Sequence, residues 1–239
     1  QTGSSIKPLS VYGPAYDMGI LKPTSYVYDV PVSVKTSSST WNVTNASNTF
    51  KGKITANDAI AYSLNTVAVT TLENVGIANS YEYLKKFGIT SIDSKNDMYY
   101  PALALGGLTN GISPYEMTQA YNAISNDGVF RNISTINHIV IDSKTITKSK
   151  NEHPVISANA ANMLKTSLNA VARYGTGKTA NLGSVTTYLK TGTTNDVKDV
   201  WTCGFTDDAT LCLWAGYDTP QSLPIYNVNS IWNQLMRYY

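Results

Sequence analysis

The sequence predicts an α/β domain, because helical and extended patterns occupy different parts of the chain. Apolar residues recur at helical spacing in several segments before residue 175. The pattern then changes to the alternation typical of strands, in three consecutive segments, and a last helical segment follows. The chain has 239 residues and 42% hydrophobic content, enough to bury a sizeable core in one large domain or two small lobes.

Apolar spacing and capping residues place the helices. They are predicted at residues 4–12, 55–76, 80–87, 113–126, 157–174 and 229–239. Gly13-Pro14 predicts a kink or an end after the first helix. The pattern of the second is interrupted around residues 63–65, and Ser113 caps the fourth.

Alternating apolar and polar residues place the strands at residues 183–191, 198–205 and 209–217. Residues 28–34 predict a further short extended piece, and residues 35–50, rich in Ser, Thr and Asn, predict a polar loop. With a two-residue turn at residues 207–208, Cys203 lies opposite Cys212. We expect two close thiols there rather than a disulfide, because directly opposed pairs are often strained.

Composition excludes several classes of partner and cofactor. The net charge is +2 and 14% of the residues are charged, with no basic run that could follow phosphates, so nucleic acid is not an expected partner. The two cysteines and two histidines lack the spacing of metal ligands, and neither a metal nor another cofactor is expected. The scarcity of histidine also indicates that the base of any nucleophilic serine is another residue.

One serine in the chain is followed by a lysine three places later, in Ser4-Ser5-Ile6-Lys7. On a helix this spacing stacks the two side chains on one face. A lysine with a depressed pKa can then remove the proton of the serine, which is otherwise a poor nucleophile. Short motifs are common, and the alternative is that Ser4 is a helix cap and Lys7 a solvated first-turn residue.

Lys190-Thr191-Gly192, followed by Thr193, ends a predicted strand. A cation and hydroxyls at that place could hold a substrate carboxylate, and the glycine would let a substrate backbone approach closely. Alone, a strand that ends in this way more often continues into an ordinary turn.

The pattern Ser-x-Asn is weaker, because it occurs five times, at Ser63, Ser94, Ser149, Ser157 and Ser167. Ser63, with Asn65, is the best candidate, because it lies in an apolar helix-break-helix segment that could project a polar pair into a cleft. Ser-x-x-Lys, Ser-x-Asn and Lys-Thr-Gly then follow one another in the order found in penicillin-binding proteins and class A β-lactamases.

Five segments, in family order, resemble the transpeptidase domain of class A penicillin-binding proteins. They are Gly3-Ser4-Ser5-Ile6-Lys7-Pro8, Ala104-Leu105-Gly106-Gly107, Ser113-Pro114-Tyr115-Glu116-Met117, Lys190-Thr191-Gly192-Thr193-Thr194-Asn195-Asp196 and Trp214-Ala215-Gly216-Tyr217-Asp218. The resemblance covers nearly the whole chain. It implies a fold similar to that of serine β-lactamases, in which an antiparallel sheet is flanked by helices and a helical lobe packs alongside.

The resemblance also implies a role for each matched residue of the catalytic group. Ser4 would attack the carbonyl of a D-Ala-D-Ala stem peptide, and Lys7 would accept its proton. Ser63 would relay a proton to the leaving amine, and Asn65 would bond the amide of the substrate. The protein would thus be a serine D,D-transpeptidase that cross-links peptidoglycan stem peptides and is acylated by β-lactam antibiotics.

The strand motif supplies the binding groups that the resemblance implies. Lys190 and Thr193 would hold the terminal carboxylate of the substrate, beside Thr191 and Gly192. The backbone N–H groups of Ser4 and Thr193 would form the oxyanion hole.

Three rival readings remain. Residues 175–179, Gly-Thr-Gly-Lys-Thr, resemble a loosened phosphate loop, but they follow a predicted helix rather than a strand. A β-lactamase or D,D-carboxypeptidase would share the acylation groups; class A β-lactamases place a deacylating glutamate three residues before Leu-Asn, where this chain has Lys165. A non-catalytic penicillin sensor is the third.

The resemblance implies, finally, that residues 1–239 form one transpeptidase domain that is incomplete at its N-terminus. The sheet of the family has five strands, two of which precede the nucleophile helix, so we expect three strands here. Residues 209–217 would then form an unpaired edge, covered by a retained peptide or a neighbouring molecule, or locally mobile. We expect the parent protein to be anchored at the extracytoplasmic face of a bacterial cell membrane, downstream of a glycosyltransferase domain, and this fragment to be soluble.

Overall fold

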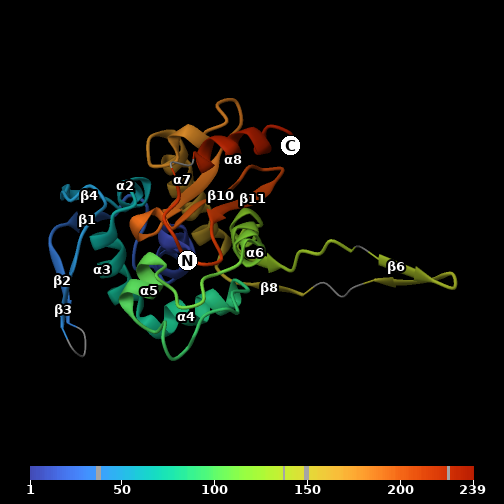
Figure 1. Cartoon of the computed structure of the whole chain (residues 1–239), viewed down its shortest axis with the longest axis horizontal. Helices are drawn as coiled ribbons and strands as arrows, with labels where there is room; N and C mark the ends of the chain where they lie inside the picture. Colours follow the sequence, from blue (N-terminus) through green and yellow to red (C-terminus); the bar gives the residue numbers. More distant parts are fainter. Residues whose placement is uncertain (36–38, 137, 148–150, 225–226) are drawn as a thin grey trace.

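An antiparallel sheet formed by the C-terminal third of the chain organises the fold (Figure 1). The computed structural model describes residues 1–35, 39–136, 138–147, 151–224 and 227–239. In spatial order, the strands of this sheet are β11 (Thr210–Gly216), β10 (Asp199–Phe205) and β9 (Tyr188–Thr193). The α-helices that contact it most are α6 (Pro114–Ser125), α7 (Ala158–Arg173) and α8 (Val228–Met236).

A helical lobe lies beside the sheet (Figure 1). Its helices are α2 (Ala56–Ala61), α3 (Asn65–Val75), α4 (Ile77–Lys86) and α5 (Tyr100–Leu105). The predicted interruption is confirmed, because α2 and α3 are separate helices. The α/β fold is confirmed as well, although α5 was not predicted.

Gly13-Pro14, predicted as a kink or an end, does not end the N-terminal helical segment, but the helix type changes there. The 3₁₀ helix η1 (Gly3–Ile6) leads into the π-helical turn η2 (Pro8–Tyr12) and then into α1 (Gly13–Asp17). A proline inside an α-helix lacks the N–H that would bond the carbonyl four residues earlier. Here that carbonyl belongs to Ser10, and the hydroxyl of Ser80 donates to it at 2.7 Å. The lost bond is thereby replaced.

The region after this helix contains more strand than predicted. The single extended piece at residues 28–34 is two strands, and the polar loop at residues 35–50 contains a third, so both predictions are wrong in part. The strands are β1 (Tyr26–Asp29), β2 (Val32–Lys35), β3 (Thr40–Val43) and β4 (Gly52–Thr55), with β1 paired to β4 and β2 to β3. Trp41 and Val43 point inward on β3, where polar neighbours hide the alternation.

The central sheet has the predicted register and number of strands within the described residues. Cys203 pairs with Cys212, and both are buried free cysteines. Strand β11 lies at one edge of the sheet and β9 at the other. What covers the β11 edge stays a prediction.

A two-stranded arm projects from the body of the molecule (Figure 1). Its tip is the hairpin of β6 (His138–Ile141) and β7 (Lys144–Thr147), and its base is the pair β5 (Val129–Arg131) and β8 (Glu152–Pro154). Every described residue of β6 and β7 is exposed, including Ile139 and Ile141. Within the described residues, no helix is long and apolar enough to cross a bilayer.

Candidate active site

Ser4 and Lys7 lie on one side of the 3₁₀ turn η1. The backbone N–H of Lys7 donates to the carbonyl of Ser4, and in this tighter helix side chains three residues apart are eclipsed. Ser4 lines a pocket of about 530 Å³, whereas the side chain of Lys7 is fully buried beneath it. The structure records no hydrogen bond between Ser4 Oγ and Lys7 Nζ among the described residues. Such contacts often tighten only when substrate binds.

Close packing holds this turn in place. The hydroxyl of Tyr121 donates to the carbonyl of Ser5 at 2.7 Å, and the hydroxyl of Ser5 donates to the carbonyl of Thr2 at 2.8 Å. A Cβ at Gly106 would lie 2.2 Å from the carbonyl oxygen of Gly3, so only glycine fits where α5 ends against the turn.

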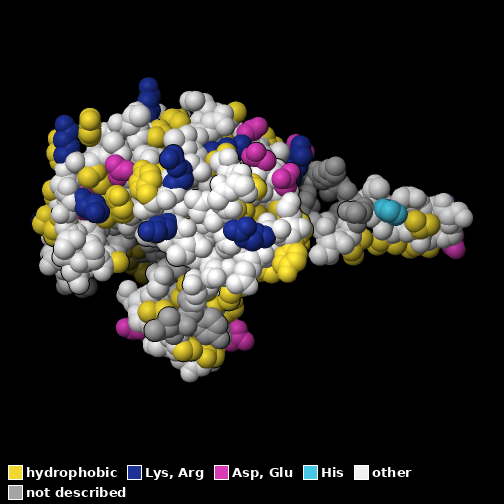
Figure 2. All heavy atoms as spheres, turned by 90° about the horizontal axis from the view of Figure 1, so that it is seen from above, with side chains coloured by type: hydrophobic (Ala, Val, Ile, Leu, Met, Phe, Trp, Pro, Cys, Tyr) yellow, Lys and Arg dark blue, Asp and Glu magenta, His cyan; other side chains and the backbone are white. Residues whose placement is uncertain are grey.

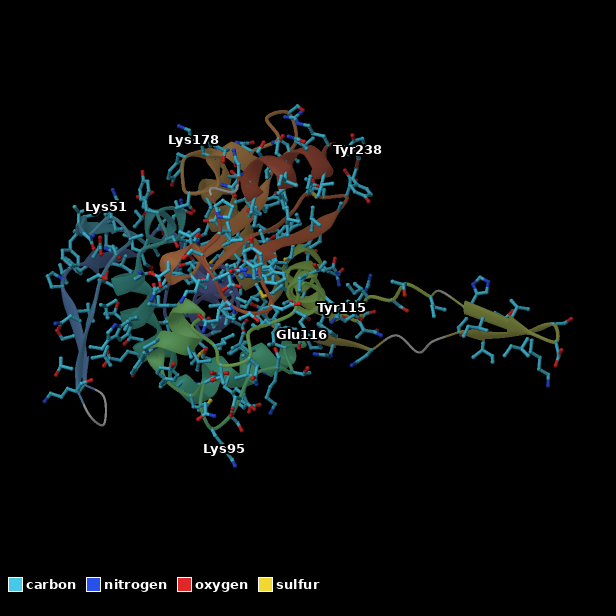
Figure 3. All side chains as sticks on the ribbon, viewed as in Figure 1. Lys51, Lys95, Tyr115, Glu116, Lys178 and Tyr238 are labelled. Atoms are coloured by element: carbon cyan, nitrogen blue, oxygen red, sulfur yellow. The ribbon has the colours of Figure 1, made fainter. Side chains whose placement is uncertain are left out.

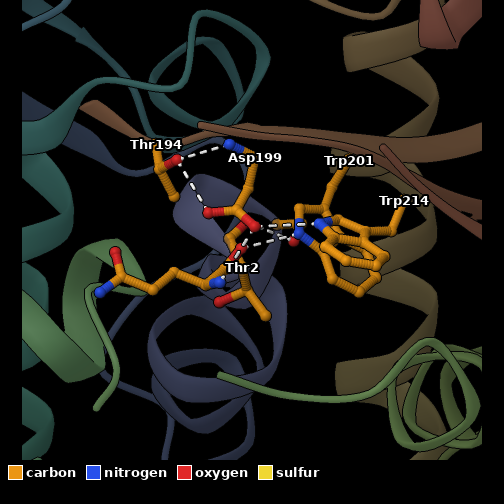
Figure 4. A network of polar contacts seen from close by, with 7 residues as sticks. Thr2, Thr194, Asp199, Trp201 and Trp214 are labelled. Atoms are coloured by element: carbon orange, nitrogen blue, oxygen red, sulfur yellow. Dashed lines mark hydrogen bonds and ion pairs between the residues drawn. The ribbon is translucent and has the colours of Figure 1, made fainter. Parts of the chain in front are cut away.

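A polar network fixes the residues that precede Ser4 against the sheet (Figure 4). The indole N–H of Trp201 donates to the carbonyl of Gln1 at 2.8 Å, and that of Trp214 donates to Asp199 at 3.0 Å. Asp199 also accepts from the hydroxyl of Thr194 at 3.0 Å. The chain just before η1 and the end of β9 are therefore tied to the same strand, β10.

Ser63 lies in the predicted break between α2 and α3, and Asn65 is the first residue of α3. Ser63 has φ of 58°, a left-handed conformation that turns the chain sharply. Lys7 Nζ donates to the Ser63 carbonyl and to Asn65 Oδ1, both at 2.8 Å, and lies 3.4 Å from Ser63 Oγ. The structure thus brings the first two motifs together around one amine, and Ser63 is the member of the five Ser-x-Asn patterns that meets Ser-x-x-Lys.

Lys190 approaches Ser63 from β9. Its Nζ donates to Ser63 Oγ at 2.9 Å and to the carbonyl of Thr191 at 2.8 Å. The side chain is fully buried, so it lies behind Ser63 instead of lining the pocket, where direct contact with a substrate carboxylate was expected.

Burial keeps both amines from holding a proton tightly. It lowers the pKa of Lys7 well below the usual range, with a smaller contribution from the nearby charge of Lys190. It also lowers the pKa of Lys190, to about 7. A neutral Lys7 amine donates its two N–H groups to Ser63 O and Asn65 Oδ1, both at 2.8 Å, and keeps a lone pair that can accept a proton.

The geometry of β9 directs the backbone N–H of Thr193 toward the 3₁₀ turn η1. In an antiparallel pair of strands, hydrogen-bonded and non-hydrogen-bonded residue pairs alternate. Thr194 N donates to Asp199 O, so the adjacent pair, Thr193 and Val200, is non-hydrogen-bonded, and its backbone N–H and C=O groups point away from the partner strand. A Cβ at Gly3 would lie 2.9 Å from Thr193 N, which places this amide beside Ser4.

Hydroxyl and amide groups that the sequence did not single out complete the pocket. The hydroxyls of Thr176 and Thr191 are hydrogen-bonded to each other at 2.6 Å. The side-chain NH₂ group of Asn229 donates to the carbonyl of Thr176 at 3.3 Å. Thr44 and Asn45, from the segment predicted as a loop, also line it. Asn45 continues the inward-facing alternation of Trp41 and Val43. A polar residue at an inward-facing position is the sequence signal that could have identified Asn45 as a site residue.

Gly192 was expected to leave room for the backbone of a substrate. In the structure, close packing within the protein requires a glycine at this position. A Cβ there would lie 2.2 Å from the carbonyl of Thr2 and 2.9 Å from Ser5 N. Because Gly192 has no side chain, β9 can pack directly against η1.

The phosphate-loop reading finds no support in the geometry. The segment follows α7 and continues into a single 3₁₀ turn, η3 (Lys178–Ala180), instead of opening a helix after a strand. Lys178 is exposed and lies at the periphery in Figure 3, together with Lys51 and Lys95. Figure 2 likewise shows basic side chains scattered over one face, without a continuous patch.

Comparison with known proteins identifies the family. Penicillin-binding protein 4 of Bacillus subtilis (strain 168) is 37% identical over 226 residues, which are 93% of this chain and 35% of that protein. Penicillin-binding protein 1A of Clostridium botulinum (strain Hall) is 30% identical over 251 residues, 98% of this chain and 30% of that protein. The chain thus spans about a third of the length of these relatives.

Solved structures share the fold. Penicillin-binding protein 1A from Haemophilus influenzae has a TM-score of 0.86 at 23% identity, over 100% of this chain and 42% of that one. Penicillin-binding protein A from M. tuberculosis, solved as an imipenem acyl-enzyme complex, has a TM-score of 0.79 at 16% identity, over 98% and 59%. The model of the penicillin binding protein transpeptidase domain matches residues 1–237. The chain therefore belongs to the penicillin-binding protein transpeptidase family.

Proposed function

We propose that this domain is a serine D,D-transpeptidase in which Ser4 is the nucleophile and Lys7 its base. The observation that carries the proposal is the buried Lys7 amine, which donates to Ser63 O and Asn65 Oδ1 below the pocket that Ser4 lines. An amine that is neutral and fixed in this way can accept the proton of a serine at physiological pH.

The reaction proceeds in two acyl transfers. Ser4 Oγ loses its proton to Lys7 Nζ and bonds the carbonyl carbon of the penultimate D-Ala of a stem peptide. The proton passes through Ser63, which lies between Lys7 and Lys190, to the nitrogen of the terminal D-Ala as that residue leaves. An acceptor amine then attacks the acyl-enzyme, gives up a proton along the same path and releases Ser4.

The backbone N–H groups of Ser4 and Thr193 stabilise the oxyanion in each step. The hydroxyls of Thr191 and Thr193 hold the terminal carboxylate, and Lys190 supports them from behind Ser63. A β-lactam follows the first transfer only, because its leaving nitrogen stays attached to the acyl group and blocks the acceptor.

A stable adduct is expected, because the described lining of the pocket offers no carboxylate that could activate a water. No Asp or Glu is among the described residues that line it. Lys165, three residues before Leu168-Asn169, forms an ion pair with Asp127 at 2.7 Å and is not among the residues that line this pocket, so it offers no substitute for the deacylating glutamate of class A β-lactamases. This arrangement favours a transpeptidase over a β-lactamase.

We further propose that the parent protein carries a membrane anchor and a glycosyltransferase domain and acts at the extracytoplasmic face of a bacterial membrane. The proposal is supported by the share of each relative that this chain spans, about a third, and by relatives named penicillin-binding protein 1A.

The test is the intact mass of the protein after incubation with benzylpenicillin. We expect one stable adduct on the wild type and none on Ser4→Ala, with thermal unfolding unchanged. Ser10→Ala is the matched control, because its hydroxyl bonds the carbonyl of Ile6 inside the same helical segment, and this variant should be labelled. Labelling of Ser4→Ala would refute the assignment, rapid turnover of the drug would favour a β-lactamase, and an unlabelled wild type would favour a non-catalytic sensor.

A further inference from the structure

Helix α3 begins without a capping side chain of its own. Leu64 occupies the N-cap position and makes no side-chain cap, although Asn65, the residue that holds Lys7, is the first of the helix. The cap comes instead from Asn45, after β3, whose Oδ1 accepts from the backbone N–H groups of Asn65 at 2.8 Å and Thr66 at 3.5 Å. A segment distant in sequence therefore fixes the start of α3.

A buried carboxylate holds this cap in turn. Asp29, at the end of β1, is fully buried, and its Oδ1 accepts from Asn45 Nδ2 at 2.8 Å and from the hydroxyl of Thr66. Its Oδ2 accepts from the backbone N–H of Lys51 at 2.8 Å. Three donors thus converge on one carboxylate close to the positive end of the α3 dipole, where a negative charge is favourable.

The same segment fixes the orientation of the Asn65 amide. Asn65 Nδ2 donates to the carbonyl of Thr44 at 2.8 Å, so Asn65 Oδ1 must face Lys7, to which it is bonded at 2.8 Å. A continuous series of hydrogen bonds consequently runs from Asp29 through Asn45 and Asn65 to the Lys7 amine.

We propose that Asp29, acting through Asn45, is a positioning residue for the base of the acylation reaction. The inference rests on the proposed function, in which Lys7 activates Ser4. Asp29 touches neither the substrate nor the reacting atoms. Through Asn45 it holds the backbone N–H of Asn65 at the start of α3, and the side-chain amide of Asn65 sets the direction of the Lys7 lone pair.

The first test is Asp29→Asn. An asparagine at this place removes the negative charge, and its NH₂ group must face either the Lys51 N–H or the pair of donors from Asn45 and Thr66. At least one buried hydrogen bond is lost, and Asn45 is held less tightly. We expect the second-order rate of acylation by benzylpenicillin, measured well below the unfolding temperature, to fall by roughly tenfold or more. If Asp29→Asn does not fold, Thr66→Val, which removes one donor and keeps the side-chain shape, should show a smaller decrease.

Asp97→Asn is the matched control. Asp97 is also fully buried and also accepts three hydrogen bonds, from the N–H of Asp93 and from the N–H and hydroxyl of Thr109. It makes no contact with Ser63 or Asn65 among the interactions of the described residues. We expect this variant to lose stability but to keep the wild-type acylation rate; an equal loss of rate would overturn the proposal.

A swap of the two partners provides the rescue. In the double variant Asp29→Asn with Asn45→Asp, the amide donates to the carboxylate in the opposite direction, and an oxygen at position 45 still caps Asn65. We expect the double variant to recover part of the rate lost in Asp29→Asn. A double variant as slow as the single one would show that Asn45 does not transmit the effect.

Amide hydrogen exchange separates this inference from the proposed function. Asp29→Asn should speed exchange at Asn65 and Thr66, and Asp97→Asn should not. If the wild type is not acylated at all, the proposed function fails, and this exchange pattern alone decides whether Asp29 positions Asn65. Unchanged exchange at both amides would overturn the inference.

Discussion

The catalytic centre and the β6–β7 arm place side chains in opposite ways. At the candidate active site, the side chains of Lys7 and Lys190 are fully buried, and they meet Ser63 across 56 and 127 residues of sequence. On the arm, apolar side chains are exposed: Ile139 is 48% exposed and Ile141 is 55% exposed. The described strands of the arm pair only with each other.

The difference shows that burial and long-range contact, rather than residue type, decide what a side chain does here. Lysine is usually a solvated cation, but burial turns these two into weak bases. Isoleucine is usually buried in a hydrophobic core, but an isolated two-stranded hairpin has no core in which to bury it. Changes at the centre should therefore have large effects on acylation, and changes on the arm should have almost none.

Lys7→Met should have the largest effect of the changes considered next. It removes the base and keeps a long apolar side chain, so the rate of acylation by benzylpenicillin should fall by roughly 10²–10⁴-fold. Lys165→Met is the control, because the Lys165 amine pairs with Asp127 outside the pocket that Ser4 lines, and its acylation rate should stay at the wild-type value. Rapid acylation of Lys7→Met would show that another group takes the proton of Ser4.

Stability should depend on pH in the direction that buried neutral lysines require. Both lysines bind protons in the unfolded chain up to about pH 10.4, whereas in the fold the pKa of Lys190 is about 7 and that of Lys7 is also lowered. Between these values the unfolded state holds more protons. The free energy of unfolding should therefore rise with pH above 7 and fall as the pH is lowered, by at most about 1.4 kcal/mol per pH unit from Lys190. Lys7 should contribute in the same direction.

Urea unfolding between pH 7 and about 8.5 measures this slope. At higher pH, the unfolded Cys203 ionises while burial raises the pKa of its thiol in the fold, which opposes the trend. The slope should decrease in Lys190→Met and be unchanged in Lys165→Met. A flat profile for the wild type would mean that both lysines are charged in the fold.

Motif spacing predicted which residues lie together at the candidate site better than periodicity predicted its surroundings. Ser4, Lys7, Ser63 and Lys190 could be named because a catalytic motif restricts residue type and separation. Asn45 could not, because the alternation that would place it inward begins at Trp41 among serines, threonines and asparagines and extends over only a few residues.

Two further differences have a tertiary cause. The first helical segment does not end at Gly13-Pro14, because the hydroxyl of Ser80 bonds the carbonyl of Ser10, 70 residues away in sequence, in place of the N–H that Pro14 lacks. Direct binding of a carboxylate by Lys190 was expected from the charge of lysine, but the strand turns this side chain inward, toward Ser63. Local sequence carries no information about either partner.

Removing the tip of the arm should have the smallest effect, and this makes it the sharpest test of the comparison. The base of the arm closes without the tip, because Asn132 N donates to Asn151 O at 3.2 Å and Asn151 N donates to Asn132 Oδ1 at 2.8 Å. Replacing residues 138–147 with a short Gly-Ser linker removes side chains that are already solvated and shortens a loop, whose closure costs little entropy. We expect an acylation rate within about twofold of the wild type and a free energy of unfolding within about 0.5 kcal/mol, measured by urea titration. A loss of more than about 1 kcal/mol, or a loss of acylation with stability intact, would show that the arm contacts the body or the substrate, and that exposure does not separate the two regions.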